Sequence, residues 1–334
     1  MKCGLIFLLM MFGLCLAVDA RVPTEASVKC ALAAVKIMVV DQNGAAVSGA
    51  KIWGGFICGN GMNDFALVDG ETDTNGIFVA KGRCNDFLRF DVRKEGYYKS
   101  EEKIYFRRSK AVPVVVDGKW QPYGETRTVV LKKICDPKPM IFSEGECREI
   151  PVFDAWIGYD LEKGDWVVPY GKGVLQDMQL RFTTLCGEGE AFCRTMEVSF
   201  TNCPYAGAYI MQRDTGSEFD TVYRADTNAN FQTYLKYEFN HMGRKVFRDE
   251  LGREQYLVFR IRAKVDEMGM LKSVLYGKLM GNWKFFECNN MWIERRVLNP
   301  TPNDVNLEDA ETARRSRLWH KQFLERQEPT IKCL

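Results

Sequence analysis

Alternating apolar and polar positions dominate the sequence, and the first clear run begins at Val35. Val35, Ile37 and Val39 fall on one side of an extended chain, with other side chains between them. This period of two predicts a half-buried strand. Residues 41–44, Asp-Gln-Asn-Gly, predict a tight turn because Asn and Gly tolerate a positive φ. Residues 47–53 then supply the returning strand of a hairpin.

The same alternation of strand and turn continues along the first third of the chain. A second turn is predicted at residues 72–76, Thr-Asp-Thr-Asn-Gly. Asp69, Asp73 and Asn75 could offer oxygen ligands to Ca²⁺, but their spacing matches no EF-hand loop, and a plain turn explains them better. Further strands are predicted at residues 77–79, 87–92, 103–106 and 125–132.

Three motifs in this region resemble the carboxypeptidase regulatory-like, or transthyretin-like, β-sandwich domain. They are D-x-N-G-x-x-V-x-G-A at residues 41–50, T-D-x-x-G-x-F at 72–78 and K-x-G-Y-Y at 94–98. The resemblance covers residues 27–134 and implies an immunoglobulin-like sandwich of seven strands. It also implies a module that lends stability, spacing or binding to its neighbours and has no catalytic residues of its own.

The alternating pattern returns between residues 151 and 300. Residues 255–265 form its clearest strand, with Tyr256 and Val258 on one side and Leu257 and Phe259 on the other. Residues 266–269 predict a turn and residues 271–279 a returning strand. Strands at regular spacing, with few helical stripes, predict a second β-sandwich-like domain.

The second half also resembles β-rich domains of uncharacterised secreted bacterial proteins. The segments that carry this resemblance are D-x-W-x-G-Y-D at 154–160, Y-G-K-G at 170–173 and the long run 259–281. It implies an architecture and no function.

The remaining segments complete a mainly β fold with a C-terminal α-helix. Residues 1–20 are typical of a secretory signal, with Lys2, an apolar stretch at 5–16 and small residues near Ala20. Residues 135–150, rich in Pro and Gly, predict a linker. Residues 301–334 predict a helix and tail, with acidic residues early and basic residues late.

The signal predicts an exported protein, secreted or periplasmic, in which disulfides can persist. Ten of the 12 cysteines follow the signal. An even number predicts a disulfide framework, although several buried thiols are an open alternative. Zinc is disfavoured, because the sequence has two histidines and no C-x-x-C pair. The predicted bonds join near neighbours in sequence: Cys58 with Cys84, Cys135 with Cys147, and Cys186 with Cys193 or Cys203.

The net charge and the sequence motifs disfavour several classes of function. The formal net charge is +2, with acidic and basic residues interleaved along the chain. This gives no long-range attraction to nucleic acid. Neither a phosphate-binding loop nor a dinucleotide fingerprint is present, and no cofactor or metal is predicted.

The best candidate for a binding site is a short stretch rich in aromatic and acidic residues. Trp156, Trp166 and Tyr170 could stack on sugar rings, with Asp160 and Asp165 beside them. Two alternatives compete with this hypothesis. Aromatic side chains at alternate strand positions usually fill a sandwich core, and Asp beside Gly usually forms turns.

The sequence therefore favours an exported, non-catalytic binding or scaffolding protein of the cell envelope or extracellular space. One alternative is a carbohydrate-binding module, and another is a glycan-active hydrolase, which would need two carboxylates about 10 Å apart or less. The expected partner is a polysaccharide or another envelope protein. No transmembrane segment is predicted, and the oligomeric state stays open.

Overall fold

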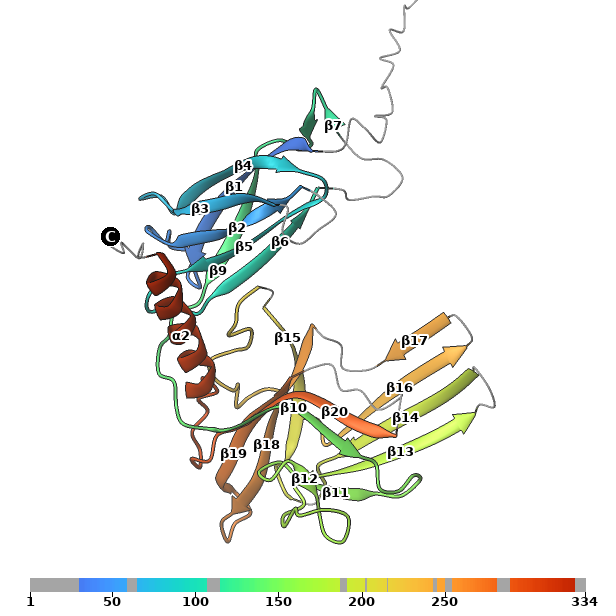
Figure 1. The fold of residues 1–334 in the computed structure, drawn as a ribbon. Helices are drawn as coiled ribbons and strands as arrows, with labels where there is room; N and C mark the ends of the chain where they lie inside the picture. The colour runs from blue at the N-terminus through green and yellow to red at the C-terminus, as the bar shows by residue number, and fades with distance from the viewer. Residues whose placement is uncertain are drawn as a thin grey trace, which may run out of the picture.

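The structure is a computed structural model, and most of the chain after the predicted signal is described. The described residues are 30–58, 65–106, 115–186, 191–201, 203–214, 216–242, 245–249, 254–280 and 289–327. Two β-sandwich-like units and one C-terminal helix make up the fold (Figure 1). The mainly β fold class predicted from the alternating pattern is confirmed.

Among the described residues, seven strands of at least six residues build the first sandwich, and two two-residue strands accompany them. The bounds are β1 (Ala31–Asp41), β2 (Lys51–Ile57), β3 (Phe65–Glu71), β4 (Ile77–Cys84), β5 (Phe87–Arg93), β6 (Ser100–Tyr105), β7 (Val115–Val116), β8 (Lys119–Trp120) and β9 (Glu125–Leu131).

These strands form two sheets that enclose one apolar core. In the first sheet, β1 pairs antiparallel with β4 and parallel with β9. The second sheet has the order β3-β2-β5-β6. Val35, Ile37 and Val39 are all fully buried between the sheets, as their spacing predicts. The turn after β1 is held by Asp41, whose Oδ1 accepts hydrogen bonds from the amides of Asn43 and Ala45 at 2.8 and 3.0 Å.

Eleven further strands of the described chain belong to the second sandwich. The bounds are β10 (Ile141–Glu149), β11 (Ile157–Asp160), β12 (Asp165–Trp166), β13 (Met178–Cys186), β14 (Ala191–Ser199), β15 (Gly207–Gln212), β16 (Tyr234–Met242), β17 (Lys245–Asp249), β18 (Gln255–Val265), β19 (Leu271–Met280) and β20 (Asn290–Leu298).

A five-stranded sheet and a six-stranded sheet face each other in this unit. Their orders are β10-β20-β19-β18-β15 and β12-β11-β13-β14-β16-β17. The predicted hairpin of β18 and β19 is present, and Leu257 and Phe259 enter the main core while Tyr256 and Val258 pack on the opposite face. Strand β10 falls within residues 135–150, which the sequence predicted as a linker. It pairs with β20 and thus belongs to the second sandwich.

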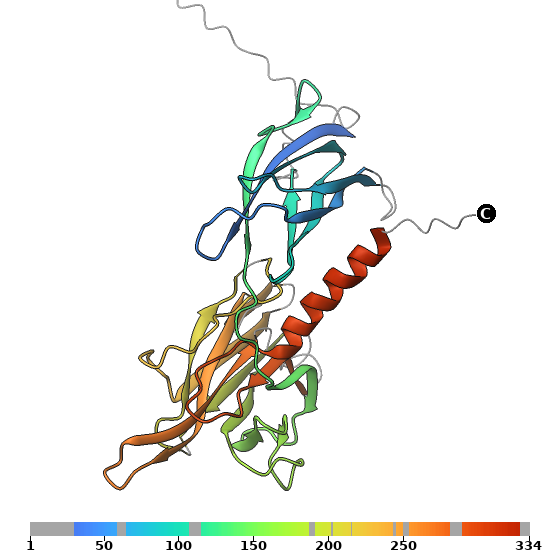
Figure 2. The same ribbon diagram turned by 90° about the vertical axis from the view of Figure 1, so that its left-hand side faces the viewer.

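The C-terminal helix α2 (Ala310–Gln327) runs along one side of the junction between the sandwiches (Figure 2). It begins later than the sequence predicts, and Asp309 caps it by accepting a hydrogen bond from the amide of Thr312 at 2.8 Å. Asn306, four residues before the helix, donates a side-chain hydrogen bond to the carbonyl of Asp136 at 2.8 Å. Ala313 and Ser316 are buried, so the first half of α2 is docked.

A buried ion pair anchors the start of this helix. The Lys278 ammonium lies 3.3 Å from the Asp309 carboxylate, and each side chain is 1% exposed. Lys278 also donates a hydrogen bond to the Thr221 hydroxyl at 3.0 Å and lies over the ring of Phe219. Burial lowers the pKa of Lys278 to about 8.

Glu308, just before the helix, is bonded to the first sandwich and to the segment that connects the two sandwiches. Its carboxylate accepts hydrogen bonds from the Tyr98 hydroxyl at 2.9 Å and from the amides of Cys135 and Asp136 at 2.8 and 2.6 Å. The ring of Tyr98 stacks on Phe219 of the second sandwich, with centroids 4.8 Å apart. Because these contacts are buried and directional, they fix the junction between the sandwiches.

Candidate functional site

Asp160, a predicted sugar-binding residue, holds a loop in place instead of facing a ligand. Its side chain is buried at the end of β11. One carboxylate oxygen accepts hydrogen bonds from the amides of Glu162 and Lys163, and the other from those of Val174 and Leu175, at 2.9 to 3.0 Å. Burial raises the pKa of Asp160, but these four donors outweigh burial and hold the pKa below its usual value.

Arg262 completes this buried network. Its Nε and Nη2 atoms donate to the two oxygens of Asp177 at 2.8 and 2.9 Å, and Nη2 also reaches Asp160 at 3.2 Å. Its Nη1 atom pairs with Glu162. Arg262 occupies a bulge in β18, with a φ of 54°. Because their oxygens are already bonded, Asp160 and Asp177 cannot act as the acid and base of a hydrolase in this arrangement.

Asp165 and Trp166 are likewise structural. The Asp165 carboxylate accepts hydrogen bonds from the amides of Trp166 and Lys172 at 2.9 and 3.0 Å. Trp166 is 3% exposed, donates its indole N–H to the carbonyl of Glu149 at 2.7 Å and packs edge-on against Tyr159. Trp166 therefore belongs to the core, as the competing interpretation predicted.

Tyr170 lies on the exposed loop that the two aspartates organise. Its side chain is 50% exposed, and Val168, Val174 and Leu175 of the same loop are also exposed. Beside the loop lies a hollow of about 400 Å³, lined by Leu175, Gln176, Asp177, Cys203 and Arg262.

Trp156, another predicted sugar-binding residue, is partly exposed and contacts the outer face of the six-stranded sheet. It is 38% exposed, and the guanidinium of Arg181 lies over its ring at 4.9 Å. Arg181 on β13 pairs with Glu197 on β14, with Nε and Oε2 2.6 Å apart. The hydroxyl of Tyr234 on β16 donates to the other oxygen of Glu197. Tyr234 is 45% exposed.

These four side chains form what we call the outer-sheet row: Trp156, Arg181, Glu197 and Tyr234. They lie on the outer face of the six-stranded sheet, because neighbours such as Leu180, Met196 and Leu235 fill the core from its inner face. The row crosses from the start of β11 to β16, a distance of about 14 Å at the usual strand spacing (Figure 1). It presents an aromatic ring at each end and a charged pair between them.

The charges in the row are fixed. The hydrogen bond from Arg181 holds the pKa of Glu197 below its usual value, and burial opposes it only in part. The hydrogen bond to Glu197 raises the pKa of Tyr234, which keeps the hydroxyl protonated as a donor. An ionised, hydrogen-bonded carboxylate can accept hydrogen bonds from a ligand but cannot serve as a general acid at neutral pH.

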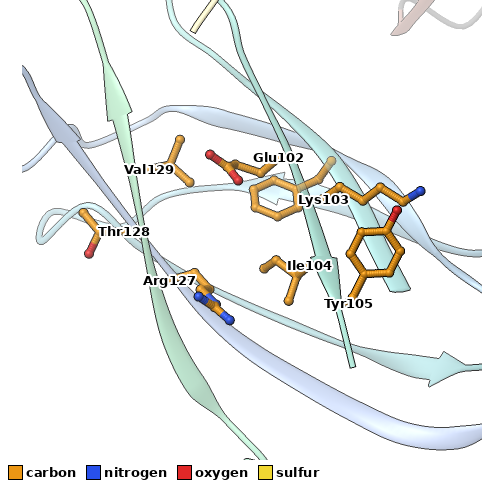
Figure 3. A pocket seen from close by; sticks show the side chains of 8 residues that line it. Glu102, Lys103, Ile104, Tyr105, Arg127, Thr128 and Val129 are labelled. Carbon is orange, nitrogen blue, oxygen red and sulfur yellow. The ribbon is translucent and has the colours of Figure 1, made fainter. Parts of the chain in front are cut away.

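The first sandwich has a smaller groove between its two edge strands, β6 and β9 (Figure 3). Its volume is about 290 Å³. Ile104 and Val129 contribute apolar side chains, and Glu102 and Arg127 face it from the two strands. Burial raises the pKa of Glu102, while Arg127 opposes that shift. A charged group pointing inward at an open edge is a common protection against unwanted strand pairing.

The six cysteines whose side chains are described, Cys30, Cys58, Cys84, Cys135, Cys147 and Cys203, are not joined by disulfides in this structure. Cys58 and Cys84 approach each other at one end of the first sandwich. Cys135 and Cys147 have different neighbours. Cys147, on β10, lies opposite Trp292 of β20, whereas the amide of Cys135 donates a hydrogen bond to Glu308. The backbones of Cys186 and Cys193 are directly opposite in β13 and β14, and their side chains lie outside the described residues. The thiol of Cys203 instead contacts the carbonyl of Ala263 at 3.2 Å.

Within the described ranges, no group of three or more His, Cys, Asp or Glu side chains is placed to hold a metal ion. In the same part of the chain, no helix combines the length and apolar character needed to cross a membrane.

Comparisons with known proteins give distant structural likeness. No family model matches the sequence, and no curated protein matches it. Among solved structures, 3-chlorocatechol 1,2-dioxygenase from Rhodococcus opacus 1CP is 16% identical, with 31% of this chain and 61% of that chain covered and a TM-score of 0.24. This chain thus spans about three fifths of that enzyme's length.

Two other solved structures are matched over more of this chain. The shaft pilin SpaA from Lactobacillus rhamnosus GG, in the form of a point mutant, is 10% identical over 75% of this chain and 87% of its own, with a TM-score of 0.23. A protein from Bacteroides uniformis ATCC 8492, named for carbohydrate binding, is 9% identical. The match covers 79% of this chain and 97% of that one, with a TM-score of 0.18. At these TM-scores the likeness carries no functional argument.

Proposed function

We propose that this chain is an exported, non-catalytic binding or scaffolding protein of the cell envelope or extracellular space. The outer-sheet row is its binding surface, and a polysaccharide is its ligand. The observation that carries the proposal is the position of Trp156 and Tyr234, two half-exposed rings at either end of the Arg181–Glu197 pair on a flat sheet face.

The chemistry of the row suits a carbohydrate. Exposed aromatic rings present flat apolar faces to the C–H groups of a sugar, and their polar edges stay hydrated. The Arg181 guanidinium, 37% exposed, can donate hydrogen bonds to sugar hydroxyls, and the Tyr234 hydroxyl, whose proton is given to Glu197, can accept them. A row fixed by its own hydrogen bonds also loses little conformational entropy on binding.

The first sandwich supports the scaffolding part of the proposal. We propose that it is a carboxypeptidase regulatory-like domain, since its two motif turns are built as such turns require. In the second turn, Oδ1 of Asp73 accepts hydrogen bonds from the amides of Asn75 and Ile77 at 2.9 and 2.8 Å. With Glu308 and Tyr98 fixing the junction, this domain would hold the second sandwich at a constant spacing from whatever it is attached to.

The proposal is tested by incubating the purified protein with a panel of soluble and insoluble polysaccharides. Retention of the protein and release of reducing ends are scored together. We expect retention on at least one polysaccharide without release. Release of reducing ends would show an enzyme, and neither retention nor release would remove the carbohydrate ligand and leave only a scaffolding role.

A further inference from the structure

Three cysteines from distant parts of the sequence converge at one end of the first sandwich. Cys30 directly precedes β1, Cys58 directly follows β2, and Cys84 ends β4. Asn85 lies between the first two: its side-chain oxygen accepts a hydrogen bond from the amide of Cys30 at 2.8 Å. Its own amide donates to the carbonyl of Ile57 at 2.8 Å, one residue before Cys58. One residue therefore bridges the two cysteine-bearing backbones.

The sulfur atoms confirm this proximity. Sγ of Cys30 lies 3.6 Å from the carbonyl oxygen of Cys58. Sγ of Cys58 lies 2.8 Å from the carbonyl oxygen of Arg83. The guanidinium of Arg83 in turn donates to the carbonyl of Cys30 at 3.1 Å. The sulfur of Cys30 therefore lies beside the backbone of Cys58, and Arg83 links the two cysteines.

The three thiols differ in their access to solvent. Cys84 is fully buried in the core of the first sandwich, whereas Cys30 and Cys58 are half-buried. Burial and the two neighbouring cysteines raise the pKa of the Cys84 thiol to about 12. The thiolate is the reactive form in disulfide exchange, and an oxidant must also reach it. Cys84 is therefore the least reactive member of the cluster.

We propose that Cys30 and Cys58 form a disulfide and that Cys84 stays a buried thiol. The bond would link the start of β1 in one sheet to the end of β2 in the other. For its occurrence in the cell, this inference rests on the proposed export, since an oxidising compartment supplies the disulfide oxidant. One thiolate of the pair attacks the oxidant disulfide and releases one thiol, and the second thiolate then attacks this mixed disulfide and releases the other. The two cysteines thus lose two electrons and two protons, and the oxidant disulfide is reduced to two thiols.

Peptide mapping of the oxidised protein tests this pairing. The purified chain is oxidised with glutathione disulfide, its remaining thiols are alkylated, and it is digested with trypsin without reduction. Cleavage after Lys and Arg places the cysteines on three separate peptides, 30–36, 52–81 and 84–89. Because the oxidation is done in vitro, the outcome is independent of export and of polysaccharide binding.

We expect the 30–36 peptide joined to the 52–81 peptide, with the 84–89 peptide alkylated. The Cys84→Ser variant should keep this cross-link, and Cys30→Ser should lose it. A cross-link of 52–81 to 84–89 in the unmodified chain would overturn the proposal in favour of the pairing predicted from sequence. Glutathione adducts on Cys30 and Cys58 with no cross-link would overturn it as well.

Discussion

Two arginine–carboxylate clusters in the second sandwich use the same chemical groups for opposite purposes. Around Arg262, three carboxylates converge, and two of them, Asp160 and Asp177, are nearly excluded from solvent. Around Arg181, the one bonded carboxylate, Glu197, is 12% exposed and both its oxygens are bonded, while the arginine is 37% exposed. The first cluster fixes a loop, and both oxygens of each of its two aspartates are bonded. The second exposes its arginine on a sheet face between two aromatic rings. Exposure of the arginine, rather than residue type, separates the loop-fixing cluster from the proposed binding surface.

Removing each arginine in turn should give the largest difference between the two clusters. Arg262→Ala leaves the buried Asp177 with only the amide of Leu161 as a donor and removes the cation beside Asp160. We expect the free energy of unfolding to fall by roughly 3 to 5 kcal/mol. Arg181→Ala removes a partly exposed pair and should cost about 1 kcal/mol or less. Urea denaturation measures both, and equal losses would contradict the distinction.

The buried Lys278–Asp309 pair at the start of α2 should make the free energy of unfolding depend on pH. Folding lowers the pKa of Lys278 from 10.5 to about 8. Between these values the unfolded chain holds a proton that the folded chain has lost, so the free energy of unfolding rises with pH. For this group, the rise from pH 7 to pH 10 should be about 2 to 3 kcal/mol.

The measurement is the difference between the unmodified chain and Lys278→Met in denaturation at several pH values. Because the methionine cannot titrate, the variant reports the pH dependence of all other groups. If the two chains have parallel profiles above pH 8, the lysine does not titrate in this window and the account of its burial is wrong.

The solvent-facing side of the first turns of α2 should show the smallest effect. Glu311 pairs with Arg314 and Arg315, and their hydrogen bonds lower its pKa to about 2. All three side chains are partly solvent-exposed, so salt screens the attraction. We expect Glu311→Gln to cost about 0.5 kcal/mol at low salt and less in high salt. A loss above about 2 kcal/mol in thermal or urea unfolding would show that this part of the helix is coupled to the junction.

The strand pattern was predictable from sequence because its cause is local. β18 alternates between two buried faces as its sequence implies, up to the bulge at Arg262. The bulge itself was not predictable, since it depends on Asp160 and Asp177, which lie far away in sequence. The sequence predicted a linker in place of strand β10, because Gly145 and its charged neighbours obscure the alternation of apolar and polar residues.

The candidate site was predictable only in part. Trp156 was identified, but its partners Arg181, Glu197 and Tyr234 lie on three other strands, and only the register of β13, β14 and β16 brings them together. The outward positions of Arg181 and Glu197 could have been inferred from alternation within their strands. That they face each other could not, because register is set by contacts between strands. Asp160 and Asp165 hold turns and Trp166 fills the core, which is the alternative that the sequence left open.

The most direct test of the account is the affinity of the outer-sheet row for a retained polysaccharide. Calorimetric titration would compare the unmodified chain with Trp156→Ala, Tyr234→Ala and the control Tyr105→Ala. Tyr105 is 49% exposed, close to the 45% of Tyr234, but belongs to the first sandwich. We predict that each row variant weakens binding about tenfold or more, roughly 1.4 kcal/mol, and that the control binds normally. Unchanged affinity in both row variants, or an equal loss in the control, would contradict the assignment of this surface.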